Sequence, residues 1–96
     1  MQPGRPQLLY REQGRDGYLR FDNGQTVFDM YWEFGGGDVL AIITVPAPRD
    51  WAQQTRMPLS QRTETLEFIA RQVIQDKTST GRNRYAIGDD TIKIFD

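Results

Sequence analysis

The chain contains neither cysteine nor histidine among its 96 residues. Without cysteine it can form no disulfide, no thiolate nucleophile and no zinc site with cysteine ligands. Without histidine it also lacks the most common general acid or base at neutral pH, and with it the serine–histidine and cysteine–histidine types of triad. Catalysis would have to use Asp, Glu, Lys, Tyr or backbone groups. The sequence therefore predicts a protein that is not an enzyme and that uses no cofactor and no metal ion.

Long apolar runs and a large net charge are absent as well. No apolar run approaches the roughly 20 residues that span a bilayer, and the start of the chain has no hydrophobic signal region. Twelve basic and 13 acidic residues give a net charge of −1, which exerts no general attraction on nucleic acid or anionic membranes. We therefore expect a cytoplasmic protein that binds neither nucleic acid nor membrane.

The length of the chain suits a single domain. Its 96 residues can bury one modest core but not two. Residues 1–6 contain two prolines and a glycine before the first strand-like segment, at Gln7–Glu12. We expect one domain over residues 1–96, with residues 1–6 flexible.

The dipeptide Asn23-Gly24 is the strongest hairpin signal in the chain, because both residues tolerate the positive φ of a two-residue type I′ turn. It predicts strands over residues 18–22 and 25–34, with Asp22 opposite Gln25. Alternation then gives this hairpin one apolar face and one polar face. The predicted apolar face holds Leu19, Phe21, Phe28, Met30, Trp32 and Phe34, and the predicted polar face holds Tyr18, Arg20, Val27, Asp29, Tyr31 and Glu33.

Residues 38–45 follow three consecutive glycines and predict a strand that is apolar on both faces. The length of the glycine turn decides how this strand faces. A three-residue turn would direct Leu40 and Ile42 into the core and leave Val39, Ala41 and Ile43 on the polar face, and a two-residue turn would exchange the two sets. The sequence leaves both alternatives open.

The second half of the chain predicts a loop, a helix and a last hairpin. Three prolines enclose a loop over residues 46–59. Ser60 is placed to cap a helix at Gln61–Lys77, whose opposite, polar side puts Arg62 in water. Residues 84–88 and 91–95 predict a hairpin. The apolar stripe of the helix is Leu66, Ile69, Ala70, Val73 and Ile74. The fold class is therefore α+β, an antiparallel sheet of five to six strands (β-β-β-β-α-β-β) with one helix packed on one face.

The predicted polar face is the first candidate site. Between Arg20 and Arg49 the chain carries four carboxylates and no Lys or Arg. Asp29 and Glu33 would stand roughly 13 Å apart along their strand, too far for the paired acids of a glycoside hydrolase. With Tyr18 and Tyr31 between and beside these acids, the face suits a basic protein partner. The alternative is an ordinary solvated sheet face.

Trp51 is the second candidate, in the proline-bounded loop beside Arg49. A tryptophan in such a loop either closes the open end of the core or acts as an aromatic anchor for a partner, with Arg49 as a neighbouring contact. The sequence leaves both interpretations open.

From Thr26 onward the layout resembles a family of small bacterial immunity proteins, the one called immunity protein seventy-four. The similar segments are "VPAPRDW", "LSQRTETLEFIARQVI" and "NRYAIGDDTIKIF". This resemblance implies a cytoplasmic, non-catalytic protein that binds and neutralises one cognate toxin.

A homodimer is the alternative function. The strand at residues 38–45 is apolar on both faces, and Val39, Ala41 and Ile43 could pack against a second copy. A small ligand-binding domain is the third alternative.

Overall fold

Six strands form one antiparallel sheet in the computed structural model of the protein, which describes residues 6–12 and 14–96. The spatial order is β1-β2-β3-β4-β6-β5. The strands are β1 (Gln7–Glu12), β2 (Asp16–Asp22), β3 (Val27–Phe34), β4 (Val39–Thr44), β5 (Tyr85–Ile87) and β6 (Thr91–Phe95). The predicted flexible segment 1–6 lies, apart from Pro6, outside the described residues.

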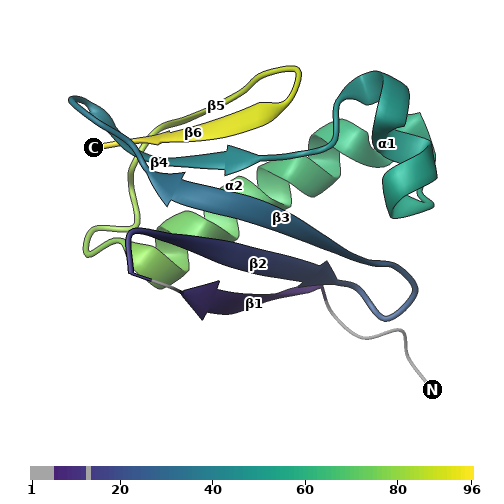
Figure 1. Ribbon diagram of the computed structural model, residues 1–96, viewed down its shortest axis with the longest axis horizontal. Coiled ribbons are helices and arrows are strands. Elements are labelled where there is room, and N and C mark those ends of the chain that lie inside the picture. Colours follow the sequence, from purple (N-terminus) through teal and green to yellow (C-terminus); the bar gives the residue numbers. More distant parts are fainter. Residues whose placement is uncertain (1–5, 13) are drawn as a thin grey trace.

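One face of the sheet is covered by α2 (Arg62–Lys77), which crosses it diagonally (Figure 1). The five positions of the predicted apolar stripe are all buried, so the amphipathic pattern identified the helix and its inner face. The largest side chains that are fully buried between the two layers are Leu19, Ile43, Leu66, Ile69, Ile92 and Ile94. The predicted α+β architecture is confirmed.

The β2–β3 hairpin has the predicted faces but a different register. Asp22 pairs with Val27, so the loop is the four residues from Asn23 to Thr26 and not a two-residue turn. The Asn23 carboxamide oxygen accepts bonds from the N–H groups of Gln25 and Thr26 at 2.9 and 2.8 Å. A shift of two residues returns every side chain to the same face, which is why the predicted polar and apolar faces survive.

The loop has this length because its last residue is used elsewhere. Thr26 is buried, and its hydroxyl donates to the carbonyl oxygen of Thr55 at 2.6 Å. This bond joins the hairpin loop to the segment after β4, a long-range contact that local turn preferences do not contain.

The side chains of β4 face as the two-residue glycine turn would place them, apart from a bulge. Trp32 pairs with Ile43 and Phe34 with Ala41, so Ala41 and Ile43 lie on the helix side and Ile42 on the other. The register shifts between Val39 and Ala41, and Leu40 packs against the core as well. The proposed homodimer surface of Val39, Ala41 and Ile43 is therefore wrong, because Ile43 is buried beneath α2.

The predicted loop at 46–59 contains a helix, α1 (Pro48–Thr55). Pro48 stands in the first turn, where its missing N–H costs nothing. Arg56 ends the helix in the left-handed region at φ 63°, with its N–H bonded to Ala52. The prolines thus flank a two-turn helix at the end of the sheet, and the prediction of a continuous loop was wrong (Figure 1).

Trp51 closes the core. It has 0% exposure, its indole N–H donates to the Pro58 carbonyl at 3.1 Å, and its ring meets the Phe28 ring edge-on at 5.6 Å. Of the two interpretations of Trp51, the structure supports the core residue, and the prediction that Trp51 contacts a partner was wrong.

The start of α2 also differs from the prediction. A 3₁₀ turn at Leu59–Gln61 precedes α2, which begins at Arg62, and the capping position is Gln61 instead of Ser60. Arg62 is 8% exposed and not in water. Its guanidinium donates to the carbonyl oxygens of Pro46, Gly88 and Asp89 at 3.1, 3.3 and 2.6 Å. Two loops therefore fold back over a helix position that the helical pattern alone assigns to solvent.

Candidate functional site

Four side chains of β2 and β3 form a compact polar and aromatic group on the sheet face opposite α2, here called the acid–tyrosine surface: Asp16, Tyr18, Tyr31 and Glu33. Cross-strand pairing brings them together, because Tyr18 stands opposite Tyr31 and Asp16 opposite Glu33. The two tyrosine rings meet edge-on with centroids 5.6 Å apart. Tyr18 is 48% exposed. The group therefore exposes aromatic rings and polar atoms together on the sheet face that α2 does not cover.

The Tyr31 hydroxyl donates to the Asp16 carboxylate at 2.8 Å. This bond, followed by burial, raises the pKa of Tyr31 to about 12. The phenol is therefore protonated at neutral pH and does not serve as a base. Its function in the surface is to hold Asp16 in place.

Glu33 is the residue of this group whose carboxylate has the fewest favourable partners. Its cross-strand neighbour is Asp16, a group of the same charge, and like charges in this position destabilise a sheet. Within residues 6–12 and 14–96 Glu33 makes no ion pair with a Lys or Arg. Glu33 therefore has no cationic partner at contact distance in the described part of the chain, although Arg11 stands opposite Tyr18 on the same face.

Asp29 was predicted to belong to the acidic surface, but its charge is largely neutralised. Arg20 pairs with it across the hairpin, and the guanidinium donates two bonds at 2.8 and 3.2 Å. These bonds lower the pKa of Asp29 below its usual value. The predicted two-residue turn set Arg20 opposite Val27, so the incorrect register concealed this ion pair.

The structure does not bring Arg49 into the same group. It lies on α1, with its side chain 87% exposed and 3.7 Å from the Asp50 carboxylate. Of the predicted contact residues, Tyr18, Asp29, Tyr31 and Glu33 share one sheet face, whereas Arg49 and Trp51 belong to α1. Asp16 was missed because the strand was predicted to begin at Tyr18; two more residues of alternation would have included it.

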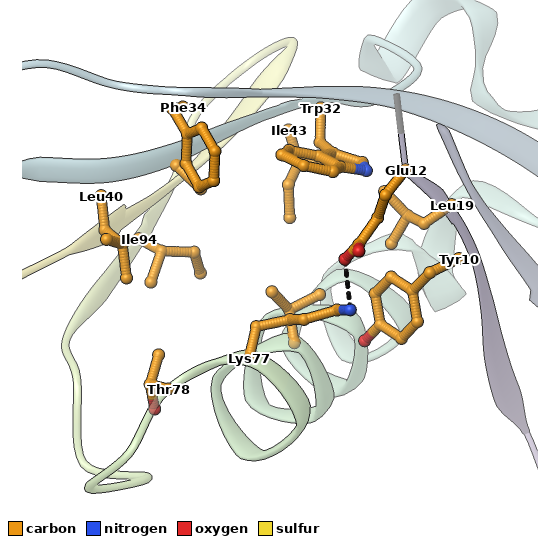
Figure 2. Close-up of a pocket in the computed structure, with 12 residues that line it drawn as sticks. Tyr10, Glu12, Leu19, Trp32, Phe34, Leu40, Ile43, Lys77, Thr78 and Ile94 are labelled. Carbon is orange, nitrogen blue, oxygen red and sulfur yellow. Dashed lines mark hydrogen bonds and ion pairs between the residues drawn. The ribbon is translucent and has the colours of Figure 1, made fainter. Parts of the chain in front are cut away.

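A cleft of about 170 Å³ opens on the other side of the sheet, between β1, β3, β4 and the last turn of α2 (Figure 2). We call it the end cleft. Its walls are mostly apolar, and sequence reasoning did not find it because its sides come from six separate elements. The lining is Tyr10, Glu12, Leu19, Trp32, Phe34, Leu40, Ala41, Ile43, Val73, Lys77, Thr78 and Ile94.

The polar groups at the rim of the end cleft satisfy one another. Lys77 forms an ion pair with Glu12, and its ammonium lies 4.3 Å from the centroid of the Tyr10 ring. The Tyr10 hydroxyl donates to Asp76 at 2.7 Å. Burial and this bond raise the pKa of Tyr10. The two charged residues that line the cleft, Lys77 and Glu12, therefore neutralise each other.

The indole nitrogen of Trp32 is the exception. It is buried and has no hydrogen-bond partner within the described part of the chain. Gly17 stands opposite Trp32, and a Cβ at Gly17 would lie 3.1 Å from the indole nitrogen. The missing side chain thus makes room for the indole. Trp32 was predicted to be core, and it is a partly buried wall of the end cleft.

Two further kinds of site are absent from the described residues. Residues 6–12 and 14–96 contain no group of three or more His, Cys, Asp or Glu side chains that could hold a metal ion. Neither helix in the described part of the chain has the length and apolar character needed to cross a bilayer.

Comparisons of the chain with protein-family models, with curated proteins and with solved structures gave no match. The geometry of the chain is therefore the structural basis of the function proposed below.

Proposed function

We propose that this protein is a non-catalytic binding protein whose acid–tyrosine surface contacts a basic segment of a partner protein. The observation that carries the proposal is the direct pairing of Asp16 with Glu33 beside the Tyr18–Tyr31 pair, on a sheet face that α2 does not cover.

Charge supports a basic partner. Two neighbouring carboxylates repel each other in the free protein, so a Lys or Arg placed between them would gain two favourable contacts and relieve that repulsion. Complementary charge also speeds association. The partner that this site favours therefore presents an exposed Lys or Arg.

The tyrosines support a contact between proteins. Tyrosine is enriched at protein interfaces because its rigid ring offers a large area at a low entropic cost. The T-shaped contact between Tyr18 and Tyr31 restricts both rings before binding, and the Tyr31–Asp16 bond restricts one further. A preorganised pair of this kind loses less entropy when a partner binds.

We further propose that the partner is a cognate bacterial toxin, as the resemblance to immunity protein seventy-four implies. An immunity protein occludes its toxin and needs no chemistry of its own. A toxin gene directly beside the gene for this protein would support this assignment, and the toxin expressed from it would be the first partner to test.

The test is affinity capture of the partner from the native host, quantified by mass spectrometry, with wild-type protein and two variants. Glu33→Lys reverses the unbalanced charge, and Tyr18→Ala removes the more exposed ring. Each should weaken binding about tenfold or more, since truncation of an interface anchor costs about 2 kcal/mol.

Glu64→Lys on α2 is the matched control, because it makes the same charge change at an exposed position on the helix side of the molecule. It should leave capture unchanged. The thermal midpoint of Glu33→Lys should stay equal to or above that of wild type, since the Asp16 repulsion is removed. Equal capture by wild type, Glu33→Lys and Tyr18→Ala would refute the proposed surface.

A further inference from the structure

The end cleft combines two features that are unfavourable in a protein without a ligand. Its walls expose apolar side chains, among them Phe34 at 51% exposure, and its tryptophan holds a buried N–H that no described group accepts. Buried donors are nearly always satisfied, so an exception calls for an explanation. Apolar clefts with a few polar groups are also the usual form of small-molecule sites.

We propose that the end cleft binds a small, uncharged, largely apolar molecule that carries one hydrogen-bond acceptor for the indole N–H of Trp32. This site is independent of the acid–tyrosine surface, because the two lie on opposite faces of the sheet.

Size sets the first limit on the ligand. The cleft measures about 170 Å³. An apolar protein cavity of about 150 Å³ takes a benzene molecule. The cleft therefore suits a single ring with a short substituent, or an aliphatic compound of similar volume.

Charge sets the second limit. Lys77 and Glu12 neutralise each other at the rim, and the Tyr10 hydroxyl is bonded to Asp76. A charged ligand would have to separate the Lys77–Glu12 pair and lose its own hydration in an apolar site. A neutral ligand has no charge to desolvate, so only the position of the Glu12 side chain opposes its binding.

The third limit is the hydrogen-bond acceptor that the ligand must carry. Glu12 controls access to the indole N–H that this acceptor has to reach. Glu12 and Trp32 stand on either side of Gly17 in the sheet, and Figure 2 shows the Glu12 side chain passing beside the indole nitrogen toward Lys77. The Glu12 side chain is 49% exposed and can rotate into water. Its displacement lets a ligand oxygen replace it beside the N–H.

Acetophenone and α-methylstyrene are a matched pair of probes, because they differ only by a carbonyl oxygen in place of a CH₂ group. The protein has two tryptophans and therefore two indole N–H signals in a ¹⁵N-correlated NMR spectrum. The Trp51 indole is bonded to Pro58 and serves as an internal reference. The variant Trp51→Phe assigns the two signals.

Acetophenone should move the Trp32 indole signal downfield and leave the Trp51 signal in place. It should bind about fivefold more tightly than α-methylstyrene, the gain expected for one net hydrogen bond. In Trp32→Phe, which keeps an aromatic wall but lacks the donor, acetophenone should lose its advantage and bind no more tightly than α-methylstyrene. Ala41→Leu, which places a larger side chain in the cleft, should weaken both.

Several outcomes would overturn the proposal. They are equal affinity of the two probes for wild type, no movement of the Trp32 signal at about 10 mM acetophenone, which excludes even weak millimolar binding, or equal movement of both indole signals. The backbone spectra of the variants show whether each is folded. If Ala41→Leu does not fold, the comparison of two probes on wild type and Trp32→Phe decides the question alone.

Discussion

Replacement of Arg62 by methionine tests whether a buried guanidinium holds the loops of this fold in place. Arg62 reaches three carbonyl oxygens, one before α1 and two in the β5–β6 turn. Methionine retains most of the apolar stem but is shorter by the end of the guanidinium group and donates no hydrogen bond. The three carbonyl groups remain when the donor is lost, which is what makes the change unfavourable.

The expected loss follows from where those carbonyls lie. A hydrogen bond from a charged donor contributes about 1.5 to 3 kcal/mol to the free energy of unfolding. That contribution is lost in full when the acceptor stays buried without a new partner. Pro46 is buried, whereas Gly88 and Asp89 are exposed and can bond to water instead. We therefore expect Arg62→Met to lower the free energy of unfolding by about 3 kcal/mol, with only part of the three-bond total lost.

Urea unfolding followed by tryptophan fluorescence measures this loss, and the thermal midpoint should fall by about 12 to 24 °C. Arg71→Met is the control, because Arg71 lies on the same helix but is 70% exposed, and its ion pair with Glu67 is long, at 3.7 Å. That surface pair should contribute less than about 0.5 kcal/mol. A loss below about 1 kcal/mol for Arg62→Met would refute the reasoning, since it would mean that water satisfies all three carbonyls.

Two further predictions concern the hairpin. The pKa of Tyr31 in the folded protein is raised to about 12. The contribution of Tyr31 to the free energy of unfolding should therefore be constant up to about pH 10 and fall between pH 10 and 12, because unfolded tyrosine has lost its proton in this range and folded Tyr31 has not. Tyr31→Phe should remove that part of the decline in urea unfolding across this range; an unchanged decline would contradict the assignment. Gly17→Ala should cost about 3 kcal/mol, since its Cβ would lie 2.2 Å from the Arg11 carbonyl oxygen and force β1 and β2 apart. A stable Gly17→Ala protein with an unchanged Trp32 indole signal would contradict that account.

The sequence predicted the two faces of the sheet because alternation depends only on whether a position is odd or even. A register shift of two residues leaves that pattern intact. The same shift altered which side chains meet: it paired Asp29 with Arg20, and Glu33 with Asp16. The faces were therefore predictable and the pairs were not.

The wrong hairpin register and the undecided facing of β4 both arise where a loop does something other than reverse the chain. The Asn23-Gly24 loop is lengthened because Thr26 bonds to Thr55, and the glycine turn is followed by a bulge at Leu40. Local turn preferences contain neither effect. Arg62 illustrates the same point for helices: periodicity placed it outside the apolar stripe, and only the tertiary fold covers it with two loops.

The two proposed sites share strands but not side chains. On consecutive positions of the β2–β3 ladder, Tyr18 and Tyr31 point to the open face, and Gly17 and Trp32 point toward α2. Because successive residues of a strand face opposite ways, a substitution confined to one side chain changes one site alone. Glu33→Lys should therefore leave acetophenone binding intact, and Trp32→Phe should leave partner capture intact. If either substitution weakened both, the two surfaces would be one coupled site, and the sheet between them would transmit the change.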